Sequence, residues 1–290
     1  MSENVITSYK GFDKNMQCRE FQYEVGKEYE MDGEIKCCNR GFHACKSPME
    51  VWDYYDMLSS RYAEVEQSGK IDKEENSTKV CSSRIKIKAE LKLADIINIG
   101  VEWLKDITST SKADGVLNDN GGRKKQIGSS GDSAQIGSSG DSAQIASSGD
   151  SAQIASSGYS AKIASSGDSA KIASSGYSAK IGSSGYSAKI GSSGYSAQIG
   201  SSGNSAQIAS SGYSAKIDST GEDSVIMCAD NSSRAKAKVG SWITLAEWKW
   251  SNEKKRNVPA CVKTEYVDGE NIKADTWYQL KNGKFVEVNE

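Results

Sequence analysis

The sequence predicts a mainly β protein: a parallel β-solenoid of nine-residue repeats, two per coil, capped by an α+β N-terminal domain and a small β C-terminal domain. Two observations predict the solenoid. Ile recurs at every ninth position from Ile127 to Ile217, and repeats of this kind bury their apolar faces by stacking on one another. Within a unit, polar and apolar residues alternate, so that Ala143 and Ile145 share one side of a strand. We divide the chain into an N-terminal domain (1–110), a loop (111–125), the solenoid (126–240) and a C-terminal cap (241–290).

The other conformations of the repeat are disfavoured by its residues. Gly or Ser fills about half of each unit, and both are poor in helix interiors. Disorder is the alternative for a tract rich in Ser and Gly, but flexible linkers do not place Ile at a constant spacing.

The segment at 147–150 predicts a turn in which Gly149 takes a positive φ.

The length of a coil follows from the length of a unit. Nine residues are too few for two strands and two turns, so we expect two units, or 18 residues, per coil, with parallel strands about 4.8 Å apart. About five coils then fill the repeat region. A coil of three units is the alternative.

An 18-residue coil sorts the variable positions into lanes. One lane after the repeat Gly holds Asp141 and four tyrosines, while the other holds mostly acidic residues and Tyr186. The outward Gln/Lys position is divided in the same way. We predict that the binding residues are Tyr159, Tyr177, Tyr195, Tyr213, Lys162, Lys180, Lys171 and Lys189.

The N-terminal segment predicts both strands and helices. Residues 9–12 and 21–27 are expected to form short strands with turns, and residues 84–91 alternate as a strand. Ser47, Pro48 and Glu50 form a helix start with Ser as the cap, and this helix is expected to run to about Leu58. Residues 93–107 place apolar side chains at helical spacing, which predicts an amphipathic helix.

The C-terminal segment predicts a cap, because an open solenoid end exposes unpaired strands. Residues 234–239 resemble a last, degenerate strand of the repeat. Trp242, Trp248 and Trp250 follow within nine residues, and we expect them to pack on the end of the solenoid. Residues 276–288 predict a β-hairpin with Asn282-Gly283 at its turn.

Composition limits the classes of partner and the compartment. The formal net charge is -2, so long-range attraction to nucleic acid is not expected. No apolar run approaches the roughly 18 residues of a membrane helix, and the first residues lack the pattern of a signal peptide. Seven cysteines, an odd number, indicate reduced thiols. We therefore expect a cytoplasmic protein of a bacterial host that binds neither membrane nor nucleic acid.

Groups suited to catalysis or metal binding are few. Cys18, Cys37, Cys38, His43 and Cys45 offer ligands for zinc, but their spacing matches no common zinc motif. A nucleophilic pair of His43 with Cys18 or Cys45 is conceivable, although nothing marks an oxyanion hole. A core or turn histidine is the favoured interpretation of His43. We therefore predict no catalytic residue, no metal and no cofactor.

The solenoid itself argues against three other functions. Calcium-binding nonapeptide rolls need the pattern Gly-Gly-x-Gly-x-Asp, which the repeat lacks. Lysines interrupt the regular hydroxyls that an ice-binding face would need. Mimicry of DNA needs an acidic rod, and residues 126–221 contain five Asp and five Lys.

Two resemblances concern the chain as a whole. The pattern Ser-Ala-x-Ile-Gly-Ser resembles the head repeats of trimeric autotransporter adhesins. The segments YKGFD (9–13), CREFQYEVGK (18–27), GFHAC (41–45), GSW (240–242) and DTWY (275–278), together with the repeats, resemble a family of phage and prophage proteins of Gram-positive gut bacteria. This second resemblance implies a phage setting and brings no established activity with it.

A further resemblance is confined to the N-terminal domain. The segment GFHA (41–44), followed by a helix that ends in Tyr54-Tyr55, is similar to a strand and helix of ADP-ribosyltransferases. The catalytic glutamate of that family cannot be placed on any particular residue of this sequence, so the resemblance implies no site residue.

These observations favour a non-catalytic binding protein that presents a rigid solenoid face to a bacterial protein or protein complex. Inhibition of host defence, of the anti-CRISPR or anti-restriction type, fits the phage resemblance. The alternatives are an ADP-ribosyltransferase-like enzyme domain with the solenoid as spacer, and a structural or adhesion component. Self-association through the solenoid is also possible.

Overall fold

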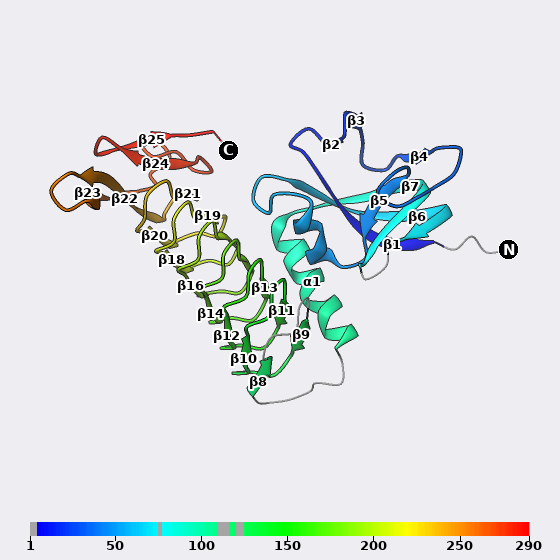
Figure 1. Cartoon of the computed structure of the whole chain (residues 1–290), viewed down its shortest axis with the longest axis horizontal. Coiled ribbons are helices and arrows are strands. Elements are labelled where there is room, and N and C mark those ends of the chain that lie inside the picture. The colour runs from blue at the N-terminus through cyan, green and yellow to red at the C-terminus, as the bar shows by residue number, and fades with distance from the viewer. Residues whose placement is uncertain (1–4, 75–76, 109–115, 120–124, 290) are drawn as a thin grey trace. The chain divides into compact units, whose positions relative to one another are not determined.

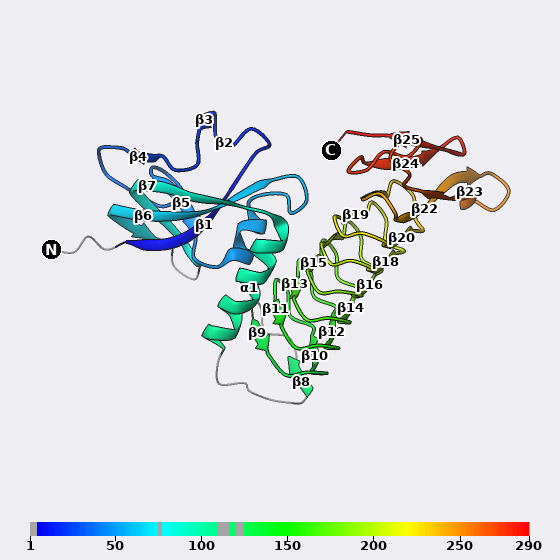
Figure 2. The same ribbon diagram turned by 180° about the vertical axis from the view of Figure 1, so that it is seen from behind.

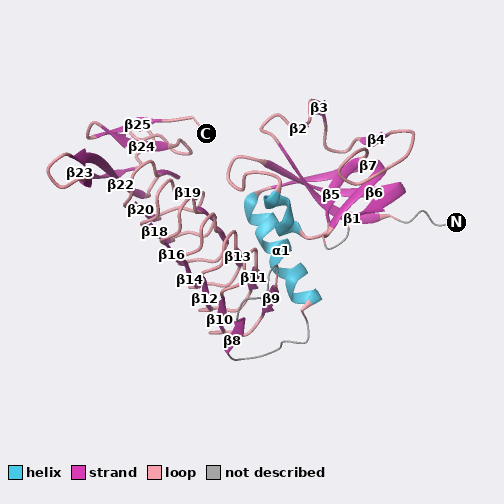
Figure 3. Ribbon diagram, viewed as in Figure 1, coloured by secondary structure: helices cyan, strands magenta, loops and turns pink. Residues whose placement is uncertain are grey.

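A computed structural model describes residues 5–74, 77–108, 116–119 and 125–289 (Figure 1). The chain divides into two compact units, Met1–Trp103 and Leu104–Glu290, and each is described by itself. The described residues are mainly strands and contain one α-helix, α1 (Leu93–Ile107), which has the bounds expected from the sequence (Figure 3). No helix in the described part of the chain is long and apolar enough to cross a membrane.

The first unit is an antiparallel sheet that closes on itself. The strand order is β4-β7-β5-β1-β6, and β6 also pairs with β7, so that β1, β5, β7 and β6 form a ring. Phe12, Tyr23, Phe42 and Ile85 belong to its buried core. Its elements before α1 are β1 (Ile6–Phe12), β2 (Gln17–Cys18), β3 (Phe21–Gln22), β4 (Glu28–Glu30), β5 (Phe42–Cys45), the 3-10 helix η1 (Pro48–Asp53), β6 (Arg61–Lys73) and β7 (Lys79–Leu91).

Residues 21–27 contain the short strand β3 and then a turn at 25–26, as expected. One expectation for this unit is wrong. The helix expected from Pro48 to Leu58 is the shorter 3-10 helix η1, and the Ser47 side chain does not cap it. The reason lies in Glu50, whose Oε2 accepts hydrogen bonds from the backbone N–H (3.1 Å) and hydroxyl (2.8 Å) of Thr78. Glu50 therefore ties η1 to the start of β7 instead of completing a capping box.

The second unit is a parallel β-solenoid of about seven turns with about 18 residues per turn. From β8 to β22, the even-numbered strands form one stack and the odd-numbered strands form the other (Figures 1 and 2). Each strand pairs in register with the strand one turn away, as Ile154 does with Ile172. The prediction of two repeats per coil is thus confirmed, and the alternative of three is excluded. The even strands of the repeat are β10 (Gln135–Ser138), β12 (Gln153–Ser156), β14 (Lys171–Ser174), β16 (Lys189–Ser192) and β18 (Gln207–Ser210), and the odd strands are β9 (Gln126–Ser129), β11 (Gln144–Ser147), β13 (Lys162–Ser165), β15 (Lys180–Ser183), β17 (Gln198–Ser201) and β19 (Lys216–Ser219).

The solenoid is longer than the five coils expected, because strands outside the strict repeat extend both stacks. At one end β8 (Val116–Asp119) pairs with β10, although residues 111–125 were expected to form a loop. Leu117 is the register partner of Ile136 but lies 19 rather than 18 residues before it, so the repeat spacing did not reveal it. Residues 111–115 and 120–124 of the expected loop lie outside the described residues. At the other end β20 (Val225–Cys228) and β21 (Arg234–Ala237) continue the stacks.

The interior of the solenoid contains Ile, Ala and Ser. All eleven repeat isoleucines are at most 8% exposed, which confirms their inward direction. The Ser that ends each strand from β9 to β19 is also buried. Seven of these hydroxyls have no hydrogen-bond partner among the described residues: Ser147, Ser156, Ser165, Ser174, Ser183, Ser192 and Ser201. Burying an unpaired hydroxyl costs free energy, so packing and the strand hydrogen bonds must outweigh that cost.

The turns of the solenoid differ from expectation in how they use glycine. The residue with a positive φ is the Ser after the variable position, as in Ser160 (52°) and Ser178 (54°). Its backbone N–H donates to a carbonyl one turn further on, as Ser160 does to Tyr177 (2.8 Å). The repeat Gly is required by close stacking instead: a Cβ on Gly194 would lie 1.9 Å from the carbonyl oxygen of Gly176. The expectation that the repeat glycine supplies a positive φ is therefore wrong.

The C-terminal cap consists of two hairpins. Strand β22 (Trp242–Ser251) joins the even stack and folds back on β23 (Arg256–Tyr266). Strands β24 (Tyr278–Lys281) and β25 (Lys284–Glu287) form the predicted hairpin around Asn282 and Gly283, and Ala235 of β21 pairs with Tyr278. The Glu247 carboxylate accepts hydrogen bonds from the backbone N–H groups of Asn282 (3.0 Å) and Gly283 (2.8 Å), which fixes this turn.

The expected role of the tryptophans in the cap is wrong for two of the three. Trp248 is half-buried and its Nε1–H donates a hydrogen bond to the Ala229 carbonyl oxygen after β20 (2.9 Å), whereas Trp242 and Trp250 are 48% and 59% exposed. The register of β22 explains this, because Trp242 aligns with the outward Val225 and Ile243 aligns with the inward Ile226. The buried cap side chains are Ile243, Leu245, Val267, Ile272, Trp277, Tyr278 and Leu280.

Candidate functional site

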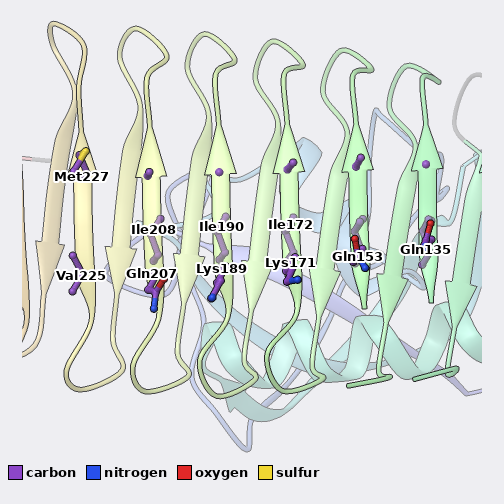
Figure 4. A pocket seen from close by; sticks show the side chains of 17 residues that line it. Gln135, Gln153, Lys171, Ile172, Lys189, Ile190, Gln207, Ile208, Val225 and Met227 are labelled. Atoms are coloured by element: carbon purple, nitrogen blue, oxygen red, sulfur yellow. The ribbon is translucent and has the colours of Figure 1, made fainter. Parts of the chain in front are cut away.

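The exposed outer side of β10, β12, β14, β16 and β18 is the first candidate site, and we call it the open face. Alternation along each strand turns Ile172 inward, at 2% exposure, and leaves its neighbours Lys171 and Ala173 exposed. Register pairing repeats this arrangement from strand to strand (Figure 4). The open face therefore has a polar lane (Gln135, Gln153, Lys171, Lys189, Gln207) beside a small-residue lane (Gly137, Ala155, Ala173, Gly191, Ala209).

The small-residue lane is the floor of a shallow trough. The trough has a volume of about 860 Å³ and is lined by residues of both lanes. A second hollow follows it along the exposed hydroxyls of Ser157, Ser175, Ser193 and Ser211. Because the floor carries only Gly and Ala, a partner that enters the trough can approach the strand backbone closely.

The predicted tyrosine lane forms a stack on the turns that follow the open-face strands. The rings of Tyr159, Tyr177, Tyr195 and Tyr213 lie 5.2, 4.9 and 5.0 Å apart between successive centroids. Between 39% and 53% of each residue is exposed. One residue, the repeat Gly, separates this lane from the serine lane in sequence, so the stacked rings border the open face on one side.

The predicted lysines do not all share this face. Lys171 and Lys189 are exposed register partners in the polar lane. Lys162 and Lys180 are register partners in the odd stack. Lys162, expected in an outward lane, is 1% exposed, and Lys180 is half-buried. Of the eight predicted residues, the structure thus groups Lys171 and Lys189 with the four tyrosines.

In the turns that follow the odd strands, the acidic residues at the variable position have a structural role. The Asp150 carboxylate accepts a hydrogen bond from the N–H of Asp168 (2.9 Å), and Asp168 accepts one from Tyr186 (2.7 Å). Asn204 does the same for Glu222 (2.9 Å). These side chains link one turn to the next, and their role in the turns explains why Asp and Asn recur at this position.

Sequence reasoning missed an apolar continuation of the open face. Val225 and Met227 occupy the polar and small-residue lanes on β20, and they are 48% and 46% exposed. Trp242 and Tyr266 extend the first of these lanes, with ring centroids 5.0 Å apart. The 18-residue spacing from Gln207 to Val225 was the available signal, but the loss of the repeat pattern there hid it.

The thiols and histidine of the first unit form the second candidate site. His43 accepts a hydrogen bond at Nε2 from the N–H of Cys38 (3.1 Å), and burial together with the nearby Lys10, Lys79 and Arg19 lowers the pKa of His43. Burial raises the pKa of Cys45 to about 12, which disfavours its reactive thiolate. In the described part of the chain, no group of three or more His, Cys, Asp or Glu residues could hold a metal ion.

A polar cluster that sequence reasoning did not identify lies in the same unit. The Lys10 Nζ atom is 3.5 Å from Cys18 Sγ and donates to the His43 carbonyl oxygen at 3.0 Å. The Tyr55 hydroxyl is 3.0 Å from Cys18 Sγ. Lys10 and Cys18 are eight residues apart, whereas Tyr55 follows Cys18 by 37 residues. The pairing of β1 with β5 brings Lys10 next to His43.

Comparison with known proteins identifies one region. Residues 6–99 match a family model described as Domain of unknown function (DUF7666). No curated protein and no solved structure matches the chain. The chain therefore combines a DUF7666 domain at residues 6–99 with a β-solenoid.

Proposed function

We propose that this is a non-catalytic binding protein whose open face engages an acidic surface of a partner protein. The observation that carries the proposal is the composition of that face: its polar, small-residue and serine lanes on β10–β18 contain two lysines and no carboxylate. Lys171 and Lys189 lie on neighbouring strands near the middle of the trough. Complementary charge of this kind steers association and sets specificity.

The architecture suits binding without a change of shape. Each open-face strand has a paired strand on both sides, so no member of the face is a free edge. A surface that is already ordered loses little conformational entropy when a partner binds. The Gln amides and Ser hydroxyls add hydrogen-bonding groups on both sides of the Gly/Ala floor.

The resemblance to phage proteins extends the proposal to the origin of the partner. A bacterial protein or complex, including one that acts in host defence, is the class that this resemblance implies. An acidic protein surface is what the two lysines recognise, so inhibition of such a complex is the finer form of the same proposal.

A capture experiment with matched charge variants tests the proposal. Immobilised full-length protein is incubated with bacterial lysate, and retained species are identified by native mass spectrometry. We compare Lys171→Glu/Lys189→Glu with Lys254→Glu/Lys255→Glu, which makes the same charge change at exposed positions between β22 and β23. The first variant should lose the captured protein, and the second should retain it.

Three results would contradict the proposal. The captured protein could bind equally to both variants, which would place the interaction elsewhere. The retained material could be nucleic acid that nuclease removes. Incubation with labelled NAD could transfer label to a lysate protein, with loss of transfer in His43→Ala, which would favour the enzyme alternative.

A further inference from the structure

The cluster of Lys10, Cys18 and Tyr55 carries an inference that is independent of the solenoid. Lys10 is 4% exposed, and its Nζ atom contacts a carbonyl oxygen, the Cys18 sulfur and the rings of Phe12 and Tyr23, each with its centroid at 5.5 Å. Among the described residues it has no carboxylate partner. A buried ammonium without a counterion is costly. The surroundings of Lys10 therefore favour its neutral amine.

Cys18 combines this buried partner with access to solvent. Its thiol is partly exposed, and in the same unit Cys37 is partly exposed, Cys38 is exposed, and Cys45 and Cys81 are buried. Cys38 also has a lysine neighbour, Lys79 (Nζ to Sγ 3.2 Å), so Cys18 is set apart by the second group on its sulfur, the Tyr55 hydroxyl. Cys18 lies at the end of β2, next to a two-residue turn in which Arg19 (φ 50°) and Glu20 (φ 65°) both have left-handed backbones. Such conformations are unfavourable for residues other than Gly and occur often at functional sites.

Tyr55 completes the cluster because Gly11 leaves space for it. A Cβ on Gly11 would lie 2.4 Å from Cδ2 of the Tyr55 ring. Gly11 therefore has a packing reason to lack a side chain, and its neighbour Lys10 supplies the amine. The ring places its hydroxyl on Cys18 Sγ, so two N–H or O–H groups, from Lys10 and Tyr55, adjoin one sulfur.

We propose that Cys18 is a nucleophilic thiol that reacts with hydroperoxides, with Lys10 as its proton acceptor and Tyr55 as a hydrogen-bond donor. A thiol with an amine base and a second donor beside it has the parts of an activated nucleophile. Hydroperoxides fit because they are small enough for a partly covered sulfur and because their oxygens accept hydrogen bonds from both neighbouring groups.

The reaction balances within the cluster and the peroxide. The Lys10 amine takes the proton of the Cys18 thiol while the sulfur attacks one peroxide oxygen. The S–O bond forms as the O–O bond breaks, and the leaving hydroxide takes the proton from Lys10 to become water. Sulfur is oxidised by two electrons and the peroxide is reduced by two, which leaves a sulfenic acid on Cys18. Burial lowers the pKa of Lys10, and this increases the share of amine able to accept the proton.

Peptide-level mass spectrometry tests the site in the full-length protein. The reduced protein is treated with hydrogen peroxide in the presence of dimedone, which labels sulfenic acids, and the label is quantified on each cysteine. Cys261 is the internal control, because it is also partly exposed and makes no hydrogen bond to a lysine among the described residues. We expect Cys18 to be labelled roughly tenfold faster than Cys261 at neutral pH.

Variants separate the role of each group. Lys10→Met keeps an unbranched apolar stem in a buried place and should slow labelling of Cys18 about tenfold. Tyr55→Phe should slow it severalfold, and Lys14→Met, at an exposed position of the same segment, should not change it. Thermal unfolding confirms that each variant is folded.

The proposal is overturned if Cys18 and Cys261 are labelled at the same rate, or if a folded Lys10→Met chain retains the fast rate. If Lys10→Met fails to fold, the comparison of Cys18 with Cys261 and the Tyr55→Phe variant decide the matter. None of these results depends on the open face, so failure here and failure of the proposed binding function are separate outcomes.

Discussion

The two units hold their strands together in different ways. In the solenoid one contact recurs along the axis, so that Ile154 meets Ile172 and Ile172 meets Ile190. In the first unit each contact is unique: Gln67 of β6 accepts a hydrogen bond from Ser8 (2.7 Å) and donates to the Phe42 carbonyl oxygen (2.8 Å), joining three segments. The fold of the solenoid can be predicted from the spacing of its residues because its contacts repeat. The contacts of the first unit join distant residues once each, so they leave no periodic pattern in the sequence.

The comparison also separates where function can reside. The solenoid offers one surface pattern repeated many times, which suits an extended interface. The first unit gathers different groups at one point, as Lys10, Cys18 and Tyr55 show, which suits chemistry on a small molecule. The following predictions test this contrast, from the largest expected effect to the smallest.

A charge in the repeated core should have the largest effect. Ile172→Asp places a carboxylate where the side chain is 2% exposed, and we expect a loss on the order of 5 kcal/mol in the free energy of unfolding. Lys171→Gln, on the exposed side of the same strand, should change it by less than about 0.5 kcal/mol. Chemical denaturation followed by circular dichroism measures both, and equal stability would mean that Ile172 does not face the interior.

Gly191 in β16 and Gly194 in the turn after it test whether close stacking of the turns, rather than strand propensity, is what excludes a side chain. Gly194→Ala forces a Cβ against the backbone of the preceding turn, and we expect a cost of about 3 kcal/mol. A Cβ on Gly191 meets nothing within 4 Å, so Gly191→Ala should be neutral to within about 0.5 kcal/mol. Thermal unfolding of the two variants gives the comparison, and a similar midpoint for both would reject the close approach of the turns.

The unique contacts of the first unit can be removed one at a time. Gln67→Leu removes the buried amide that also donates to Val80 and Ser82, and it should cost about 2 kcal/mol. Ser8→Ala removes one donor to that amide and should cost about 1 kcal/mol. Residue-resolved hydrogen exchange assigns the loss to the first unit. Equal effects of the two changes would show that Gln67 is not the centre of the network.

One tyrosine from each lane tests how much ring stacking contributes to the free energy of unfolding. Tyr177 has a ring on each side, at 5.2 and 4.9 Å, and Tyr177→Ala should cost about 1–2 kcal/mol. Tyr186 is the only tyrosine of the other lane, and Tyr186→Ala should cost less than about 0.5 kcal/mol. Unfolding curves measure the difference, which should vanish if the rings do not interact in solution.

A smaller effect is expected from pH in the cap. The Asn271 side chain and the backbone N–H groups of Glu270 and Ile272 donate hydrogen bonds to Asp268 and lower its pKa from 3.8 to about 2. A lowered carboxyl pKa stabilises the fold above the unfolded value, so this contribution is complete above pH 3.8 and declines as the pH falls toward 2. Asp268→Asn should remove that decline, and an unchanged difference from wild type across pH 2–4 would contradict it.

Periodicity and local signals account for what could be predicted. The spacing of Ile predicted the two repeats per coil, and the Asn282-Gly283 pair predicted the last hairpin. The role of the repeat glycine could not be predicted, because the clash that excludes a Cβ comes from a residue one turn earlier. Trp242 was misassigned because the register that turns it outward depends on Val225 of a neighbouring strand.

The candidate sites show the same limit. The stacked tyrosines followed from arithmetic on the repeat, but the burial of Lys162 depends on its three-dimensional surroundings and not on its lane. Lys10, Cys18 and Tyr55 each stood in a segment noted for its resemblance to other proteins. The contact between Cys18 and Tyr55 joins residues 37 positions apart, which no local pattern encodes.

The in-register pairing of residues 18 positions apart has a consequence for how this protein can vary. Every turn of the repeat pairs with the turn before it and the turn after it through the same strand positions. Adding or removing one full turn, which is two repeats, therefore leaves the strands beyond each end of the solenoid joined to the same stack as before. Adding or removing a single repeat would join the strands at one end to the other stack. The length of the rod can thus change in steps of 18 residues while the strands at either end keep their partners.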